Sequence, residues 1–209
     1  MLMVRESPQP EWRPEREVPI RILGQVQGTF LVCEGGQGLI VIDQHAAHER
    51  ILFEKFKKQY ETKSVPVNRL LLPLLMEVTA EEGFILSSYV EAFVSIGFEI
   101  DPAGEKTFAL RSVPSGVDDR TAQEMVREIL AELIQWKKEG KGTETMEPLL
   151  VTLACHTAIR ANQPLRKEEM EELVRGLASI HPYGTCPHGR PIFLTMSRDE
   201  LNKQFKRTH

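Results

Sequence analysis

The strand-like segments of this chain lie near its two ends, and the segments between them mostly have the periodicity of helices. Apolar residues alternate or run continuously over 20–26, 29–34 and 39–42, and again over 191–196. A sheet must bury a face against another element, and strands kept apart from a run of helices are typical of α+β proteins. The sequence therefore predicts an α+β fold.

The same separation predicts how the chain divides. We expect residues 18–64 and 180–209 to build one α/β lobe from both chain ends, and residues 65–179 to form a second, mainly helical lobe inserted into it. Residues 1–17 are rich in Pro, Glu and Arg and have no apolar core. This composition excludes a secretory signal and is typical of a linker, so we expect a fragment or a separately expressed domain of a longer protein.

Helices are expected where apolar residues recur at helical spacing. These segments are 44–58, 80–96, 121–138, 148–161 and 166–178. An apolar stretch flanked by Pro, 65–78, is expected to enter the inserted lobe in extended form, and 98–100 with 108–113 to form a hairpin. Ser197 and Glu200 have the spacing of a capping box, which predicts a short final helix.

Composition limits the function classes without choosing one. The 209 residues are 41% hydrophobic and 27% charged, as in ordinary globular proteins. No apolar run approaches the ~20 residues of a membrane span, so we expect no membrane partner. The formal net charge is −4, so any DNA binding should use local basic patches and be weak and salt-sensitive. Three scattered cysteines are too few for a disulfide framework and favour a reducing cytoplasm.

The densest group of polar residues begins where the strand over 39–42 ends. Asp43 is a good helix N-cap, and His45 and Glu49 are four residues apart, on one face of the helix that follows. Carboxylate and imidazole together suit Zn²⁺, Mn²⁺ and related ions. Glu54 lies about 140° around the helix from Glu49, so direct ligation by Glu54 is not expected. The alternative is a capped helix with solvated charges, and from this segment alone both interpretations stand.

A second group lies in the segment C-P-H-G-R-P over 186–191. Cys186 and His188 offer a thiol and an imidazole in a loop braced by Pro and Gly, which can hold both ligands rigidly. Arg190 can neutralise a nearby phosphate or pair with a carboxylate. The alternative is a tight turn with incidental polar residues.

The remaining cysteines are harder to assign from the residues alone. Cys155 lies inside an apolar helical segment, where a cysteine is usually a small buried hydrophobe. His156 beside it is open to three interpretations: a solvated side chain, a weak ligand or a capping partner. Cys33 follows the apolar residues 30–32 in a strand, and we expect it in the core.

Metalloprotease motifs do not fit these spacings. Zincins need two histidines four residues apart with Glu directly after the first, and the inverted motif ends in Glu-His. Here His45 and His48 are three residues apart, and Glu49 follows the second. Paired cysteines like those of zinc fingers and ribbons are also absent. A metalloprotease is therefore a distant alternative.

Together, these segments resemble the C-terminal endonuclease domain of MutL-type DNA mismatch-repair proteins over nearly the whole chain after the linker. Residues 43–54 match the family signature D-Q-H-A-x-x-E-x-x-x-x-E at every specified position, and 186–191 match C-P-H-G-R-P in full. Ala154 and Cys155 match the start of a third family element, A-C-R. The conjunction in this order is very specific, and it favours a metal-binding role for Cys155.

The resemblance implies a function and a set of partners. It implies nicking of one strand of double-stranded DNA with Mn²⁺ or Mg²⁺, with Zn²⁺ contributing to the site. It implies a homodimer formed through the lobe that contains both chain ends, with the inserted lobe regulatory. It also implies a MutS-type mismatch-recognition protein as partner of the full-length protein, and ATP bound only by an N-terminal domain that lies outside this chain. The implied location is the nucleoid of a bacterial cytoplasm.

The same resemblance implies which residues act. The implied metal ligands are Asp43, His45, Glu49, Cys155, Cys186 and His188. The first three of these are the implied catalytic residues. The residues implied to support the ligands or to contact a phosphate are Glu54, His156, Arg160 and Arg190.

Three positions depart from the family pattern. Position 156 is His where A-C-R has Arg, and the F-x-R element found in part of the family would fall at 193–195, where the Arg is missing. Bacterial members often carry Q-x-x-L-x-P for binding the replication sliding clamp. Here Asn68 replaces Gln, with Leu71 and Pro73 at the matching positions, so we expect weak docking of the clamp. The alternative is a strand that enters the core.

The main alternative function is a non-catalytic dimerisation and docking module with structural zinc. Some family domains lack the acidic helix motif and serve only to dimerise. The presence of Asp43, His45 and Glu49 favours the enzyme, because a purely structural zinc site needs no surplus of carboxylate ligands.

Overall fold

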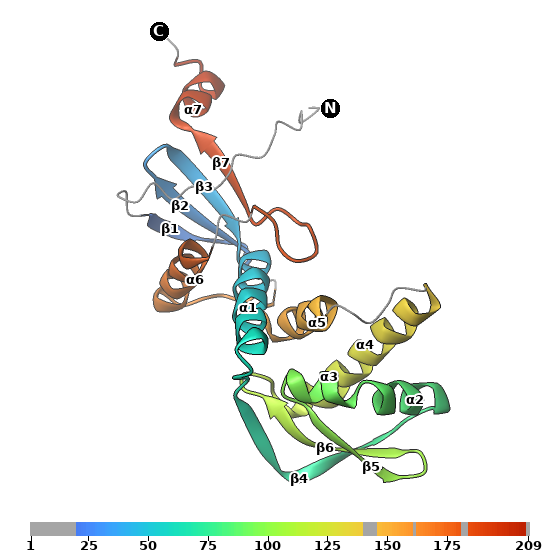
Figure 1. The fold of residues 1–209 in the computed structure, drawn as a ribbon. Helices are drawn as coiled ribbons and strands as arrows, with labels where there is room; N and C mark the ends of the chain where they lie inside the picture. The colour runs from blue at the N-terminus through green and yellow to red at the C-terminus, as the bar shows by residue number, and fades with distance from the viewer. Residues whose placement is uncertain (1–19, 140–145, 161, 181–183, 208–209) are drawn as a thin grey trace. The chain divides into compact units, whose positions relative to one another are not determined.

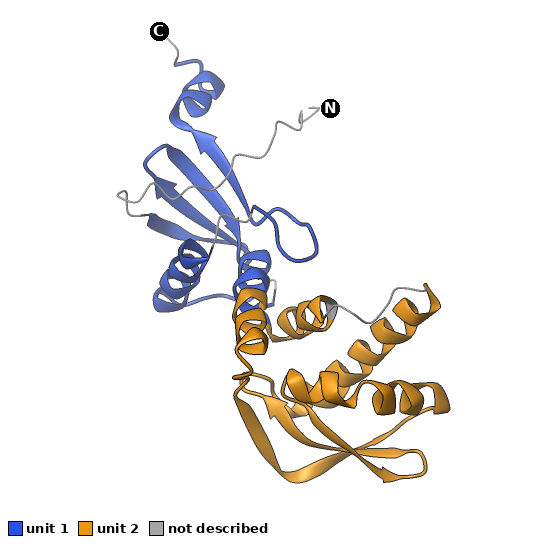
Figure 2. Cartoon of the chain, in the orientation of Figure 1, with its two compact units in different colours: residues 1–52, 158–209 blue, residues 53–157 orange. Residues whose placement is uncertain are grey.

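The structure is a computed structural model that describes residues 20–139, 146–160, 162–180 and 184–207. The described residues form helices and antiparallel sheets (Figure 1), so the predicted α+β class is confirmed. The expected linker over 1–17 lies outside the described residues. Two compact units make up the chain: unit 1 contains residues 1–52 and 158–209, and unit 2 contains residues 53–157 (Figure 2).

Unit 1 is built on a four-stranded antiparallel sheet in the order β1-β2-β3-β7. Its strands are β1 (Arg21–Val26), β2 (Phe30–Gly35), β3 (Gly38–Asp43) and β7 (Phe193–Ser197). The last strand returns from the other end of the chain to pair with β3 (Figure 1). Gly38 makes room for this pairing: its φ is 148°, and a Cβ there would lie 2.3 Å from the carbonyl oxygen of Met196.

One face of this sheet is buried against helices. Side chains from α6 (Lys167–Ser179) and from the start of α1 (Gln44–Glu61) share one core with β2 and β3. The buried residues of this core are Leu31, Cys33, Ile42, Ala46, Ala47, Leu165, Leu173, Val174, Leu177, Cys186 and Ile192. Cys33 is in the core as predicted, and burial raises the pKa of its thiol to about 11, which makes Cys33 an unreactive thiol at neutral pH.

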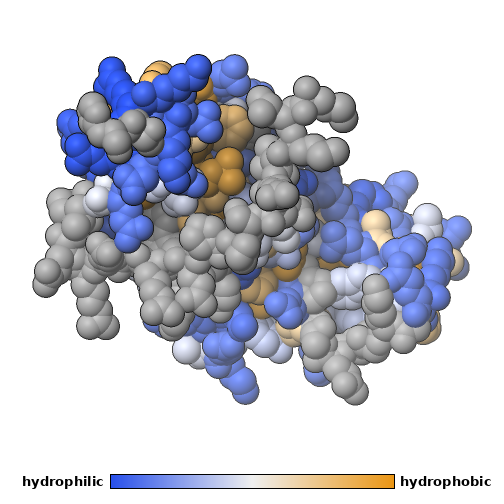
Figure 3. All heavy atoms as spheres, turned by 90° about the horizontal axis from the view of Figure 1, so that it is seen from above, coloured by the Kyte–Doolittle hydropathy of each residue, from blue (hydrophilic) through white to orange (hydrophobic). Residues whose placement is uncertain are grey.

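The opposite face of the same sheet is apolar and partly open to solvent. The strand register places Val41 between Val32 and Leu194, and Leu39 beside Met196. We call the following set the open sheet face: Val26, Phe30, Val32, Leu39, Val41, Leu194 and Met196. The exposed fractions of Leu194 and Phe30 are 67% and 38%, and Figure 3 shows apolar side chains (orange) reaching the surface among hydrophilic ones.

Unit 2 combines a three-stranded antiparallel sheet, in the order β4-β6-β5, with helices. The strands are β4 (Val67–Glu77), β5 (Glu99–Gly104) and β6 (Thr107–Pro114). The helices are α2 (Ala80–Ser88), α3 (Val90–Ser95), α4 (Asp119–Lys138) and α5 (Glu147–Thr157). Helix α4 buries Met125, Ile129 and Leu133, as its periodicity predicts. The segment 65–78 is more than an entry into this unit, because most of it is the long strand β4 paired with β6.

The single helix predicted over 80–96 is two helices that meet at Tyr89. Two consecutive serines precede the break, and their hydroxyls donate to carbonyls four residues back: Ser87 to Gly83 at 2.9 Å and Ser88 to Phe84 at 2.8 Å. Such bonds bend a helix because they compete for the carbonyls that carry the backbone ladder.

The division of the chain differs from the expected one of 18–64 with 180–209 against 65–179. Residues 158–179 belong to unit 1, because α6 buries Leu173 and Leu177 in the core of the four-stranded sheet. The part of α1 from Phe53 onward belongs to unit 2. Helical periodicity identifies an apolar face but not the sheet that covers it, so the sequence did not reveal which unit α6 joins.

The final helix, α7 (Arg198–Gln204), begins as predicted. The Oγ of Ser197 accepts a hydrogen bond from the N–H of Glu200 at 3.2 Å, and the carboxylate of Glu200 accepts one from the N–H of Ser197 at 2.8 Å. This reciprocal pair is the capping box. Across the described part of the chain, every helix is too short or too polar to span a bilayer.

Candidate metal centre

Asp43 lies at the junction where β3 runs directly into α1. Its Oδ1 accepts hydrogen bonds from the backbone N–H groups of His45 at 2.9 Å and Ala46 at 3.0 Å. These groups would otherwise be unsatisfied at the start of the helix. The N–H of Asp43 donates to the carbonyl of Ile192 at 2.9 Å, which ties the helix start to the segment that leads into β7. The predicted cap is confirmed, and it sets the direction in which His45 and Glu49 project.

His45 and Glu49 contact each other one turn apart on α1. The Nε2 of His45 lies 3.1 Å from Oε1 of Glu49, and its Nδ1 lies 2.8 Å from the carbonyl oxygen of Ile159. A carbonyl only accepts, so we assign the proton to Nδ1, and the neutral ring then turns an unprotonated Nε2 toward the carboxylate. Two electron-rich atoms face each other in this arrangement, and a proton or a cation between them would stabilise it.

Glu49 is a buried carboxylate whose second oxygen lacks compensation. Its side chain is 2% exposed, and Oε2 has no hydrogen-bond partner among the residues that the structure describes. The Nδ1 of His188 lies 3.5 Å from Oε2. One donor atom each from Glu49, Cys186 and His188 lie within 4.8 Å of one another. An uncompensated buried carboxylate costs several kcal/mol, whereas a cation at this group would satisfy it.

The loop over 184–192 presents Cys186 and His188 through bonds within its own backbone. The N–H of Cys186 donates to the carbonyl of Arg190 at 2.8 Å, and the N–H of Gly189 donates to the carbonyl of Cys186 at 2.9 Å. Burial raises the pKa of the Cys186 thiol, and backbone N–H groups of Arg190 and His188 at the sulfur oppose this and favour the thiolate. The side chain of Glu49 raises the same pKa further, through a hydrogen bond and through its negative charge. A nearby cation would add to the opposing effect and favour the thiolate further.

The remaining sequence-predicted residues are distributed over both units. Arg160 and Arg190 are exposed in unit 1. Glu54 is half-buried in the part of α1 that belongs to unit 2. His156, on α5 of unit 2, contacts the carboxylate of Glu128 on α4 through Nε2. Cys155 is half-buried on the same helix. Because Cys155 belongs to unit 2, its participation in the metal site stays a prediction, and Asp43 acts as the helix cap described above.

Sequence reasoning missed two buried polar residues beside the candidate ligands. Gln44 is fully buried, and its Nε2 donates to the carbonyls of Gly28 at 2.6 Å and Gln163 at 3.0 Å. Arg50 is 9% exposed, and its Nε donates to the carbonyl of Thr185 at 3.0 Å. A signal for Arg50 was present in the sequence, because helical spacing places it between two alanines of the apolar face of α1.

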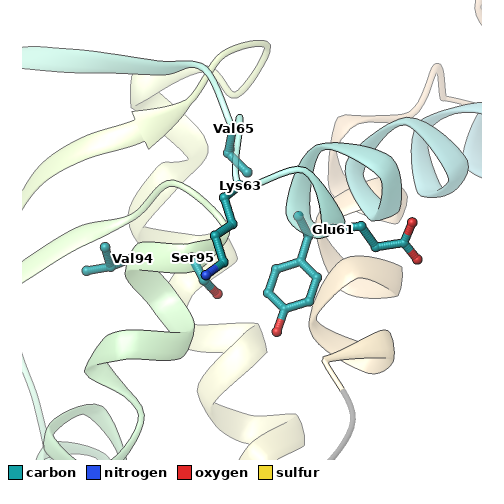
Figure 4. Close-up of a pocket in the computed structure, with 6 residues that line it drawn as sticks. Glu61, Lys63, Val65, Val94 and Ser95 are labelled. Carbon is teal, nitrogen blue, oxygen red and sulfur yellow. The ribbon is translucent and has the colours of Figure 1, made fainter.

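A separate pocket in unit 2 does not have the chemistry of this group. Its volume is about 450 Å³, and its lining residues are Tyr60, Glu61, Lys63, Val65, Val94 and Ser95 (Figure 4). These side chains include one acid and one base but no thiol and no imidazole. The candidate metal centre is therefore the group around Glu49 in unit 1.

The structure thus defines an α+β protein in which one unit carries both an open apolar sheet face and a buried carboxylate beside a thiol and an imidazole. A family model described as the MutL C-terminal dimerisation domain matches residues 23–165. The chain belongs to this family.

Curated relatives agree with the family match. The chain is 35% identical over 202 residues to the DNA mismatch repair protein MutL of Halothermothrix orenii, a match that covers 96% of this chain and 31% of the relative. It is 36% identical over 206 residues to the protein of the same name from Dichelobacter nodosus, covering 98% of this chain and 35% of the relative. The chain therefore spans about a third of the length of these relatives.

Proposed function

We propose that unit 1 carries the metal site of an endonuclease that nicks one strand of double-stranded DNA. The observation that carries this proposal is Oε2 of Glu49, a buried carboxylate oxygen without a hydrogen-bond partner among the described residues. It lies in a group with Cys186 and His188. A carboxylate, a thiolate and an imidazole are common ligands of divalent metal ions. The donors therefore fit a metal ion.

The donor types indicate which ions the site would hold. The thiolate of Cys186 and the imidazole of His188 favour Zn²⁺, while the carboxylate of Glu49 also suits Mn²⁺ or Mg²⁺. His45 is oriented for ligation because its Nδ1 is engaged by Ile159 and its Nε2 faces Glu49. We further propose that Asp43, in the same unit, contributes carboxylate charge.

The proposed chemistry is hydrolysis of a phosphodiester. When bound, a divalent ion supplies Lewis acidity at the phosphate and a source of activated water. The residues of the chain hold the ion, fix the ring of His45 and bring positive charge to the DNA. Arg160 and Arg190 are exposed in the same unit and are suited to contact phosphates.

Metal analysis combined with a plasmid-nicking assay tests this proposal. Cys186 and Cys33 are 1% and 0% exposed, but only Cys186 lies in the donor group, so the same substitution at each forms a matched pair. Cys186→Ala should lose most of its zinc and Cys33→Ala should retain it. Glu49→Gln should reduce nicking in Mn²⁺ by at least about 100-fold, because it removes the charge of the buried ligand.

Two results would contradict the enzyme. A wild-type chain without zinc, or equal zinc loss in both cysteine variants, would reject the metal site. If the wild-type chain binds zinc but does not nick DNA, the result would instead favour the alternative function, a non-catalytic docking module with structural zinc.

The open sheet face supports a second proposal, that the chain forms a homodimer. Monomeric proteins rarely expose a contiguous apolar patch of this kind without a partner. Val26, Leu194 and Met196 are 48%, 67% and 40% exposed. A twofold axis would pack the face of one copy on the same face of the other. The family to which the chain belongs is described as a dimerisation domain.

A third proposal concerns the replication sliding clamp. The pairing of β4 with β6 is interrupted between Arg69 and Leu74, and within this interruption Leu71 is 102% and Leu72 is 79% exposed. These two leucines are therefore accessible at the surface of unit 2, although the segment as a whole belongs to the strand β4. We propose that the segment from Asn68 to Pro73 inserts its leucines into a groove of the clamp.

Mismatch repair together with a MutS-type protein is proposed for the longer protein, by analogy with the relatives' name.

A further inference from the structure

Arg50 is a buried cation that the proposed chemistry does not use. It is 9% exposed, and at about 100° per residue it lies between Ala46 and Ala47 on the face of α1 that enters the core of unit 1. Arginine is almost never buried unless it is paired. Among the contacts of its side chain is a hydrogen bond from Nε to the carbonyl of Thr185 at 3.0 Å.

Thr185 directly precedes Cys186, so this bond joins α1 to the loop that presents two candidate ligands. Within the loop, the isolated bridge between Thr185 and Pro191 and the bond from the N–H of Ile192 to Gly184 at 2.9 Å close the loop on itself. Bonds of this kind fix the shape of the loop but not its distance from the helix.

The loop is attached to α1 at two points on opposite sides of its ligands. After the ligands, the carbonyl of Ile192 accepts from the N–H of Asp43 at 2.9 Å. Before the ligands, the carbonyl of Thr185 accepts from Arg50. Because Arg50 follows Glu49 in the same helix, a bond from Arg50 to the loop sets the separation between Glu49 and the loop.

We propose that Arg50 is a positioning residue that holds Cys186 and His188 against Glu49. The inference rests on the proposed metal site for its purpose, but the positioning itself is a property of the chain without metal. A guanidinium donates through Nε from a fixed planar group, and lysine has no donor at that place. A hydrogen bond from a charged group is also stronger than one from a neutral donor, so its loss should release the loop.

Hydrogen exchange in metal-free protein tests the proposal in the whole 209-residue chain. Arg50→Met keeps the aliphatic stem and removes the donor, and Arg50→Lys keeps both the stem and the charge if the first variant folds poorly. Arg21→Met is the matched control, because Arg21 is exposed and pairs with Glu34 at the surface. The loop amides of Cys186, Gly189 and Ile192 should exchange about ten-fold faster or more in both Arg50 variants. Amides in β2 and β3 should be unchanged.

The comparison with β2 and β3 separates positioning from a general loss of stability. A residue that merely fills the core would accelerate exchange in the strands and the loop by the same factor, and that result would overturn the proposal. Unchanged exchange in the loop would also overturn it. Acceleration confined to the loop, with Arg21→Met like the wild type, supports it.

Zinc titration of the same variants distinguishes this inference from the metal proposal. If both hold, the zinc affinity of Arg50→Met falls by about the factor seen in loop exchange, because the loop must be reordered before it binds. If the wild-type chain binds no zinc, the metal proposal fails, and the exchange experiment still decides the role of Arg50.

Discussion

Four polar residues at the junction of β3 with α1 and in the first two turns of α1 have different roles, although they are close in sequence. Asp43 caps the helix, and Glu49 carries the uncompensated carboxylate. His45 and His48 contact the two backbone polar groups of the same residue. Nδ1 of His45 contacts the carbonyl of Ile159, and Nδ1 of His48 accepts from the N–H of Ile159 at 2.8 Å. In their neutral forms the two rings therefore carry their protons on different nitrogens. Both polar groups of the Ile159 backbone are satisfied.

Asp43 provides a prediction in which stability and activity separate. Its Oδ1 accepts two backbone N–H groups, and asparagine caps helices as well as aspartate does. Asp43→Asn should therefore lower the free energy of unfolding by less than about 0.5 kcal/mol, whereas Asp43→Ala should lower it by about 1 kcal/mol. Both variants should lose nicking activity if the carboxylate charge serves the metal site. Urea unfolding and plasmid nicking are the two measurements.

Either of two outcomes would leave the proposed metal role of Asp43 without support. An Asp43→Asn protein that nicks at the wild-type rate shows that capping is its whole role. An Asp43→Asn protein as unstable as Asp43→Ala shows that the charge acts through folding, so its activity would say nothing about a metal.

At the scale of whole elements, the four-stranded sheet has one face in the core and one apolar face that is partly exposed to solvent. Alternation along β2, β3 and β7 sends Leu31 and Ile42 inward and Val41 and Leu194 outward. A sheet with polar residues on its outer face would be stable in contact with water, but the open sheet face is apolar. The element itself thus supports the proposed homodimer.

Two exposed leucines on different sheets provide a matched test of the dimer. Leu194 on β7 and Leu71 on β4 are 67% and 102% exposed. Leu194→Glu places charges at the proposed twofold contact and should shift the chain from a dimer to its 23.8 kDa monomer at micromolar concentration. Leu71→Glu should remain dimeric and instead weaken binding to the sliding clamp at least about ten-fold. Light scattering measures the mass. A wild-type monomer, or dissociation by both substitutions, would reject the assignment of this face.

The sequence predicted most elements because their signals are local. The cap at Asp43 and the box at Ser197 depend on residues within one turn, and both are observed. The break at Tyr89 was missed because the apolar periodicity continues through it. The break is caused instead by the hydroxyls of two serines, which bond to helix carbonyls. The placement of α6 was missed because an apolar stripe does not specify the sheet it covers.

The candidate site was predictable to the extent that it consists of motifs. The motifs named Glu49, Cys186 and His188, and the structure brings donor atoms of these three residues together. Arg50 and Gln44 were missed because each donates to a backbone carbonyl that is distant in sequence. A backbone carbonyl has no residue signature, so no motif can indicate such a bond.

At the scale of the whole molecule, unit 1 is assembled from both chain ends, and its candidate ligands come from both. Glu49 precedes the segment that forms unit 2, whereas Cys186 and His188 follow it. No short stretch of chain contains the site, so the site forms only when unit 1 folds. The site cannot survive partial unfolding of either half of unit 1, and its ligands lie in the same unit as the open sheet face.

The charge of the whole molecule leads to the last prediction, the salt dependence of DNA binding. The chain has 30 acidic and 26 basic side chains and a formal net charge of −4, so contact with phosphates depends on a few local cations. If Arg160 and Arg190 are two such contacts, the logarithm of affinity falls with the logarithm of salt at a slope of about −1.8. A rise from about 50 to 200 mM KCl then weakens binding about 12-fold.

Single substitutions can be compared with that slope by titrating a fluorescent duplex across a range of KCl concentrations. Arg190→Ala and Arg160→Ala should each make the slope shallower by about 0.9, because each removes one phosphate contact. Arg21→Ala is the control, since this exposed arginine of unit 1 is paired with Glu34 and should leave the slope unchanged. A slope that is equal in all three variants and the wild type would place the DNA away from these arginines. Binding at the site and nicking require the same contacts. The nicking rate at low DNA concentration should therefore fall with salt in parallel with affinity. A nicking rate that does not depend on salt would argue that the DNA is held by other surfaces of the protein.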